Sequence, residues 1–213
     1  HISSRAKLDN LLILTVEDTG LTTTCRPTSI PSAGKSDIGD LERYLDATKS
    51  VLLFAQRVIL VEGMSEVFLI PRLVKQVMNV DLEEYGVSFV PIYGVHFGSY
   101  LKLFVDKGIR KKCAVITDGD LKPSDASEID DAEFPRIDDL KRHESDLIRI
   151  FNCKTTFERA VALPENLKVF SKAAKELGAT NVSTQLNDFY NRRISLTYSC
   201  LLYTSPSPRD LST

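Results

Sequence analysis

The chain has 213 residues, 43% of them hydrophobic and 26% charged, which is the composition of an ordinary globular protein with one domain and a fragment, or two small domains. No apolar run approaches the ~18 residues of a membrane span, so no membrane-spanning helix is expected, and a formal net charge of -2 gives no overall attraction to nucleic acid. The four cysteines lack C-x-x-C spacing, and we expect free thiols in a reducing cytoplasm rather than a disulfide framework or a zinc site.

Both ends of the chain are atypical of a natural domain. The sequence starts at His1 without a methionine, so we expect it to be cut from a longer protein. The stretch from Cys200 to Thr213 has no amphipathic period and resembles the translated read-through of a sequencing adapter; a disordered Ser/Pro tail is the alternative. Residues 200–213 are therefore predicted to be a non-native tail outside the fold.

The first quarter of the chain predicts a short β-structure followed by a helix. Residues 8–17 have the pattern of a strand, and the Thr-, Pro- and Ser-rich stretch up to Lys35 predicts a hairpin and a loop. Between Asp37 and Ala55 apolar residues recur on one helical face. We expect this helix to lead straight into a strand that begins at residue 57.

From residue 57 onward, short β-branched runs alternate with helical patterns. This alternation predicts an α/β fold, in which a parallel sheet carries helices on both faces. The expected strands cover residues 57–61, 87–93, 113–117 and 147–151. The expected helices cover residues 65–79, 97–106, 156–162, 165–177 and 181–192. Between the last two strands, the acidic stretch 121–146 is expected to be a mobile, solvated insertion, with a regulatory or partner-binding role as the alternative.

Two carboxylates lie where the first of these strands gives way to a helix. Glu62 ends the apolar run, Gly63 permits a tight turn, and Glu66 falls in the first turn of the following helix. A glutamate there has an ordinary explanation, because it interacts favourably with the helix dipole. With this spacing, however, both carboxylates are also able to face one cleft.

A second acidic pair, Asp118 and Asp120, follows the third strand and flanks Gly119. Asp and Gly are common in turns, so this motif alone is weak. Ligands of parallel sheets gather beyond the carboxyl ends of the strands, so we expect the two acidic clusters to converge. Several carboxylates in one place repel each other without a cation, and hard oxygen ligands suit Mg²⁺ or Mn²⁺. The sequence therefore predicts a metal site and phosphoryl-transfer chemistry.

Three further residues lie near the same predicted edge. Glu158 opens the helix after the fourth strand, where it is either a further ligand or a carboxylate that stabilises the helix start. His96 follows the second strand, and we expect a structural or solvated histidine there rather than a catalytic one. Lys154 could bind phosphate, although lysines are common at such junctions.

The pattern E-G-x-x-E after one strand and D-x-D after a later one resembles the Toprim domain of topoisomerases, bacterial primases and certain nucleases. More narrowly, the chain is similar to the OLD (overcoming lysogenization defect) family of ATP-dependent nucleases. The similar segments are LERYLDATKSVLLFAQRVILVEGMSEVFLIPRL, YGVSFVPIYG, YLKLF, AVITDGD and TTFE. The opening HISSRAKLDNLLIL is similar to the end of that family's ABC-type ATPase head, where a histidine senses the γ-phosphate, and His1 would be that histidine.

This resemblance implies a Rossmann-like Toprim fold that cuts DNA with two divalent ions. Its metal ligands would be Glu62, Glu66, Asp118, Asp120 and Glu158. Glu62 would bind metal or act as general base, and Asp118 would be the second catalytic carboxylate. The resemblance also implies a cytoplasmic phage-defence protein with no membrane contact, ATP in an ATPase head absent from this chain, and homo-oligomers formed through that head.

The implied organisation has four parts: residues 1–35 as the end of the ATPase head, 36–56 as a connecting helix, 57–199 as the Toprim nuclease domain, and the tail. The sequence departs from the family in two places. Gly94-Val95 stands where the family often has Gly-Gly, and the family's C-terminal lysine segment is lacking, so we expect an incomplete enzyme.

Two other functions remain open. A haloacid-dehalogenase-type phosphatase also places Asp-x-Asp after a strand, but that class usually has a threonine where this chain has Lys122, and it gives no role to Glu62 and Glu66. A Toprim fold that only binds or assembles would be expected to lose the metal carboxylates, which are retained here.

Overall fold

The computed structural model describes residues 7–16, 19–44, 51–93, 97–119 and 135–192. The chain divides into two compact units, and each is described by itself. The first unit comprises His1–Thr117 and Phe134–Asn152, and the second comprises Asp118–Glu133 and Cys153–Thr213. Within the described part of the chain, no helix is long and apolar enough to cross a membrane.

A four-stranded parallel sheet forms the centre of the first unit. Its strands are β3 (Arg57–Val61), β4 (Val87–Pro91), β5 (Lys112–Thr117) and β6 (Ile148–Asn152), in the order β4-β3-β5-β6. On one face of the sheet the central strands carry fully buried side chains, including Val58, Leu60 and Val115, and on the other face Ile59 and Ala114 are half-buried. Because β3 and β5 are neighbours, whatever follows each of them begins at the same edge of the sheet.

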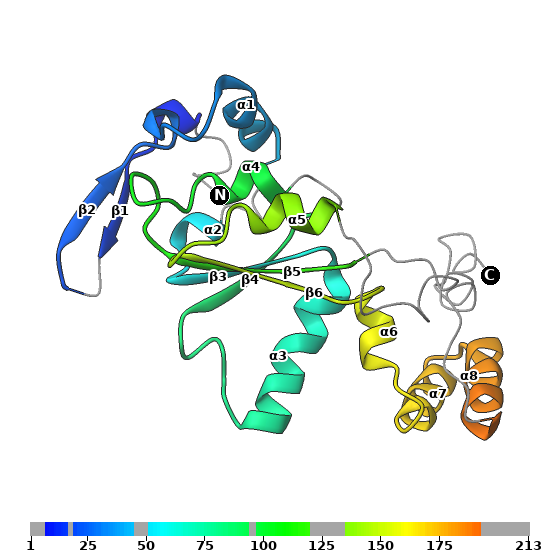
Figure 1. The fold of residues 1–213 in the computed structure, drawn as a ribbon. Coiled ribbons are helices and arrows are strands. Elements are labelled where there is room, and N and C mark those ends of the chain that lie inside the picture. The colour runs from blue at the N-terminus through cyan, green and yellow to red at the C-terminus, as the bar shows by residue number, and fades with distance from the viewer. Residues whose placement is uncertain (1–6, 17–18, 45–50, 94–96, 120–134, 193–213) are drawn as a thin grey trace. The chain divides into compact units, whose positions relative to one another are not determined.

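Helices cover both faces of this sheet (Figure 1). One face is covered by α3 (Met64–Met78), and the other by α2 (Val51–Phe54), α4 (Phe97–Leu101) and α5 (Pro135–Lys141). Gly63 caps the start of α3. Asn79 ends the helix in the left-handed conformation at φ 54°, where asparagine is tolerated better than most residues.

The N-terminal part of the first unit is a hairpin followed by a helix. It contains η1 (Leu8–Asn10), β1 (Ile13–Val16), β2 (Thr22–Cys25), η2 (Pro27–Ser29) and α1 (Lys35–Tyr44). The strands β1 and β2 pair antiparallel, which confirms the predicted hairpin. An ion pair of 2.7 Å between Lys102 Nζ and Asp37 Oδ1 joins α1 to the end of α4.

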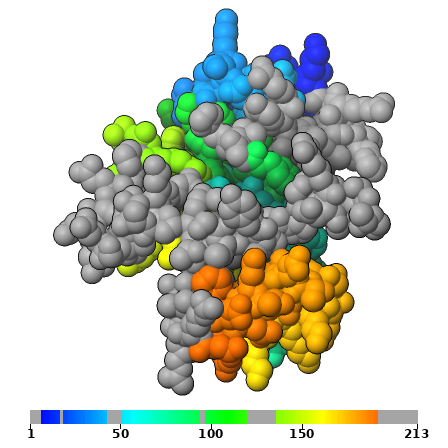
Figure 2. Space-filling view, turned by 90° about the vertical axis from the view of Figure 1, so that its right-hand side faces the viewer, coloured from blue at the N-terminus to red at the C-terminus, as the bar shows by residue number. Residues whose placement is uncertain are grey.

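The described helices of the second unit are α6 (Phe157–Val161), α7 (Leu167–Glu176) and α8 (Thr180–Arg192). Figure 2 shows α7 and α8, in yellow-orange and orange, packed against each other. Leu167 and Leu186 form a small core of their own between them. The Ser171 hydroxyl adds a 2.9 Å bond to the Ser183 carbonyl, so this helix pair has both apolar and polar contacts.

Most predicted elements are confirmed, with three corrections. The predicted strand 8–17 is shorter, because Leu8–Asn10 form the 3₁₀ helix η1 and β1 covers Ile13–Val16. The predicted loop 121–146 contains α5, which begins with a proline, a favoured first helical residue, and buries Ile137 and Leu140 on one face. The predicted helix 97–106 ends at Leu101, because the apolar run that follows lies in tight turns that bury Leu103 and Phe104. The connecting segment 36–56 falls on α1 and α2, and residues 45–50 lie outside the described residues.

Candidate functional site

The first predicted site residue, Glu62, lies one position beyond β3 at the carboxyl edge of the sheet. Its carbonyl accepts a 2.9 Å hydrogen bond from the Tyr93 amide, and the Val61 carbonyl accepts one of 2.8 Å from Ile92. The ladder between β3 and β4 therefore continues past the end of the regular strand. This extension fixes the backbone of Glu62 at the edge where ligands of parallel sheets bind.

The Glu62 side chain is held by a hydroxyl and a guanidinium. Its Oε1 accepts a short hydrogen bond from the Thr117 hydroxyl and a 2.5 Å bond from Arg136 Nη2. Arg136 Nη2 also lies 3.0 Å from Thr117 Oγ1. The three residues form one cluster, in which the Glu62 side chain is 24% exposed and that of Arg136 is 51% exposed.

The second predicted residue, Glu66, is buried with 4% exposure. Its Oε2 accepts a 3.2 Å hydrogen bond from the Gly63 amide, so the carboxylate caps the helix in which it lies. This contact is the ordinary role of a glutamate in a first helical turn. It also orients the carboxylate at the same strand-to-helix turn that carries Glu62.

In the second unit, Asp118 holds the start of α6. Its Oδ1 accepts a 2.8 Å hydrogen bond from the Phe157 amide, and the Gly119 amide donates to the Thr155 carbonyl at 2.8 Å. These two bonds tie the Asp-Gly turn to the first turn of α6. Glu158, one residue further along that helix, is exposed.

Of the remaining predicted residues, the structure describes only Lys154. Asp120, His1 and His96 lie outside the described residues, and Lys154 is exposed. Among the residues that the structure describes, no group of three or more His, Cys, Asp and Glu side chains gathers into a metal-binding cluster. The convergence of the two acidic clusters therefore stays a prediction. The donor chemistry fits a hard divalent cation, because all the ligands in question are carboxylates.

Two residues of the Glu62 cluster, Thr117 and Arg136, were not singled out from the sequence. Thr117 ends β5, and the pairing of Val61 with Ile116 places it beside Glu62, so the strand register would have found it. Arg136 gave no such signal, since it lies in the stretch that was predicted to be a loop. Only the docking of α5 brings it to the edge of the sheet.

The comparisons with known proteins bear on this edge of the sheet. Residues 53–120, which hold Glu62, Glu66, Asp118 and Asp120, match the family described as "Overcoming lysogenization defect protein-like, TOPRIM domain". These residues are therefore similar to an OLD-like Toprim domain. Glu158 lies beyond the matched OLD-like Toprim segment.

Two solved structures have a similar fold. The C-terminal region of the Burkholderia pseudomallei OLD protein is 22% identical, with 71% of this chain and 80% of that chain covered, at a TM-score of 0.53. The C-terminal region of the Xanthomonas campestris pv. campestris OLD protein is 23% identical, with 72% and 78% covered, at a TM-score of 0.50. No curated protein matches the sequence. The predicted fold class, a parallel α/β sheet of the Toprim type, is confirmed.

The OLD-like Toprim assignment has a coarse functional meaning. Toprim domains of this kind are nuclease-type domains and generally bind divalent metal ions. The assignment accounts for Glu62 and Glu66, for which the phosphatase alternative had no role. The match therefore favours the nuclease hypothesis over the phosphatase hypothesis.

Proposed function

We propose that this chain carries the catalytic part of a divalent-metal-dependent DNA endonuclease that hydrolyses phosphodiester bonds. The observation that supports this most strongly is the placement of Glu62 and Asp118 in the chain. Each directly follows one of two neighbouring parallel strands, β3 and β5, inside the matched Toprim segment. Carboxylates that follow neighbouring parallel strands start from the edge where ligands of such sheets bind.

The proposed chemistry uses Mg²⁺ or Mn²⁺ held by Glu62, Glu66, Asp118 and Asp120, with Glu158 as an additional ligand. The bound ions would stabilise the charge that develops on phosphorus and lower the pKa of water. Glu62 would accept a proton from the attacking water or bind metal, and the Thr117 hydroxyl would hold its Oε1 in place. Asp118 would present a carboxylate whose Oδ1 is already oriented by the Phe157 amide.

The wider context of the proposal follows from the family resemblance. The parent protein would act on DNA in the cytoplasm, in defence against phage. It would be regulated by ATP bound to an ATPase head and would form homo-oligomers through that head. The domain boundaries at residues 35, 56 and 199 belong to the same proposal.

The test is plasmid nicking with Mg²⁺ and with Mn²⁺ by the parent protein beside this chain, together with calorimetric titration of Mn²⁺ into this chain. Glu62→Gln should reduce nicking by about 100-fold or more, because a catalytic carboxylate is lost, and should weaken Mn²⁺ binding. Glu83→Gln is the matched control, because it removes an exposed carboxylate elsewhere in the first unit and should leave both readouts unchanged. Equal nicking by Glu62→Gln and the unaltered chain would contradict the assignment.

The Arg136 contact supports a second candidate function, a Toprim fold that only binds or assembles. A carboxylate neutralised by an internal guanidinium does not need a metal ion to be stable at the sheet edge. The Mn²⁺ titration separates the two functions. A saturable site that disappears in Glu62→Gln supports the nuclease, and no saturable binding together with no nicking supports the binding module.

A further inference from the structure

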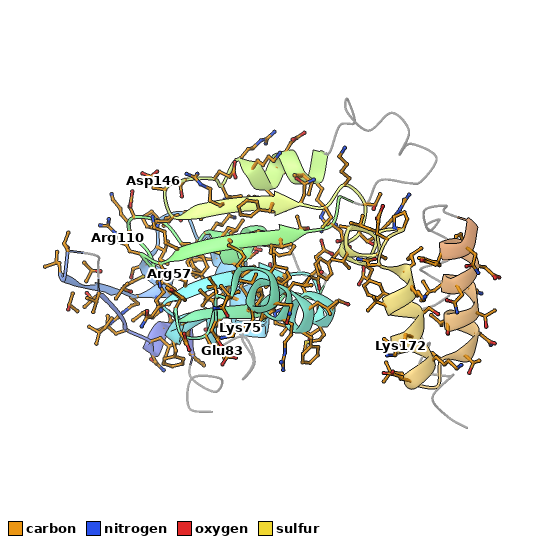
Figure 3. All side chains as sticks on the ribbon, turned by 90° about the horizontal axis from the view of Figure 1, so that it is seen from below. Arg57, Lys75, Glu83, Arg110, Asp146 and Lys172 are labelled. Atoms are coloured by element: carbon orange, nitrogen blue, oxygen red, sulfur yellow. The ribbon has the colours of Figure 1, made fainter. Side chains whose placement is uncertain are left out.

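The hollow at the amino-terminal end of the parallel strands lies at the other edge of the sheet from Glu62. It has a volume of about 790 Å³ and is lined by the first residues of β3 and β5, the residues before β6, and the last three residues of β1. Figure 3 shows Arg57, Arg110 and Asp146 gathered at this end of the strands. The volume lies within the range of pockets that hold one small ligand.

Positive charge predominates in the lining. Two carboxylates, Asp106 and Asp146, line the hollow. Four cationic side chains line it as well: Arg57, Arg110, Lys111 and Lys112. This local excess is hidden in a chain whose formal net charge is -2. An excess of cations in a concave surface focuses an attractive potential for anions.

Three of the four cations are oriented by main-chain carbonyls rather than by carboxylates. Within the described residues, Arg57 donates to the Tyr85 carbonyl at 2.7 Å. The Lys111 and Lys112 ammonium groups donate to main-chain carbonyls at 2.6 and 2.7 Å. A carbonyl fixes the direction of a cation but does not cancel its charge. The positive charges are thus held in place without being neutralised by these contacts.

Two of these cations are also direct neighbours across the sheet. Arg57 of β3 is in register with Lys112 of β5. Burial lowers the pKa of Lys111, so keeping this ammonium charged costs free energy. An anion in the hollow would reduce this cost. The remaining cation, Arg110, contacts Asp106 at 3.8 Å, but Asp106 is 85% exposed, so that pair contributes little.

The other wall of the hollow is apolar and open to solvent. Leu14 and Val16, which point to the outer face of β1, are 65% and 68% exposed, and Phe54 at the end of α2 is 74% exposed. An exposed aromatic ring beside cations is the combination on which nucleic-acid bases stack while their phosphates are neutralised. An acidic protein surface is a poorer fit, because it would neutralise the cations but leave the apolar wall exposed to water.

We propose that this hollow binds a nucleotide unit, with its phosphate on the cations of β3 and β5 and its base against Phe54. The unit is supplied either by a free nucleotide or by a single strand of nucleic acid. This site lies outside the carboxylate site, and its function does not require a divalent metal ion. It is therefore independent of the proposed nuclease activity.

The test is fluorescence anisotropy of a labelled single-stranded oligonucleotide, with the full chain in EDTA so that metal-dependent binding is absent. The double variant Arg110→Gln/Lys112→Gln should weaken binding about tenfold at low salt. It should also reduce the slope of log affinity against log salt by roughly 0.7 for each lost phosphate contact. Phe54→Ala should weaken binding about fivefold or more, because one stacked base is lost.

The matched control is Lys75→Gln/Lys172→Gln, which removes two exposed lysines that are paired with carboxylates outside the hollow. It changes the net charge by the same amount and should leave the affinity within about twofold. Asp106→Asn removes a carboxylate from the hollow and should strengthen binding. A misfolded protein would not gain affinity, so this variant separates a loss of the site from a loss of the fold.

Competition with unlabelled ATP and ADP identifies the source of the nucleotide. If ATP or ADP displaces the oligonucleotide at the same concentration of nucleotide units, the ligand is a free nucleotide. If neither displaces it, the ligand is a single strand. Either result supports the site when the hollow variants weaken binding as stated. Equal affinities for the hollow variants and the lysine control would overturn the proposal. The proposal would also be overturned if the hollow bound neither nucleotide nor strand but bound an acidic protein, and the same variants abolished that binding. The hollow would then be a protein-docking surface.

Discussion

Among single residues, Arg136 stands in the most direct relation to the proposed metal chemistry. Its guanidinium donates to the Glu62 oxygen and the Thr117 hydroxyl that face the carboxyl edge of the sheet. A guanidinium and a divalent cation compete for the same carboxylate, because each is attracted to its negative charge. Arg136 is thus expected to compete with metal binding at Glu62.

Replacing Arg136 with glutamine should tighten Mn²⁺ binding by about twofold to fivefold, since a half-exposed ion pair is worth at most about 1 kcal/mol. Isothermal titration at constant ionic strength measures the effect. Arg136→Lys retains the charge and should stay near the unaltered affinity. Weaker Mn²⁺ binding in Arg136→Gln would show that the arginine assists the metal site instead of competing with it.

Between elements, the Asp37 carboxylate links α1 to the end of α4. Burial alone would raise the pKa of Asp37, but hydrogen bonds from Lys102 and the Gly34 amide outweigh it and hold the pKa below its ordinary value of 3.8. A pKa that is lower in the folded state means that the ionised carboxylate stabilises the fold. This contribution is present above pH 3.8 and is lost as the pH falls through the lower folded value.

Asp37→Asn should therefore lower the free energy of unfolding by about 1–2 kcal/mol at pH 7, as expected when a hydrogen-bonded charge is removed. The difference from the unaltered chain should shrink as the pH is lowered below 3.8. Urea denaturation followed by circular dichroism at several pH values measures it. Asp9→Asn, at an exposed position, is the control. A difference that persisted unchanged at pH 3 would contradict this account of Asp37.

The sequence predicted an element correctly where the pattern of that element's own residues was enough to identify it. The strands and α3 were predicted because β-branched runs and apolar periodicity are local properties, and Glu62 and Glu66 followed from them. The sequence did not predict α5, because its helix is short and its burial depends on contacts made by Ile137 and Leu140. Arg136 was missed for the same reason, as its contact with Glu62 spans 74 residues. Such pairings depend on tertiary packing, which no local period encodes.

For the molecule as a whole, two hydrophobic cores lie in two units. The larger core surrounds the sheet, and a smaller one lies between α7 and α8. Leu186→Ala should lower protection from hydrogen exchange in α7 and α8 while leaving β3 and β5 unchanged, because the deleted contacts belong to the smaller core. Leu60→Ala, at a fully buried position of the sheet, should do the reverse. Hydrogen exchange with mass spectrometry measures both, and loss of protection in both units from either variant would contradict separate cores.

The register of β3 and β5 gives the first unit an electrical polarity along the strand direction. Arg57 and Lys112 begin the two strands, and Glu62 follows β3 at the opposite end. Glu62 is paired with Arg136, whereas the cations at the start of the strands are in excess, so the formal charge of -2 masks a cationic pole. A polyanion that diffuses toward this unit would be turned to meet the cationic pole first. At high ionic strength the ~3–10 Å screening length would erase this steering and leave only short-range contacts to orient the encounter.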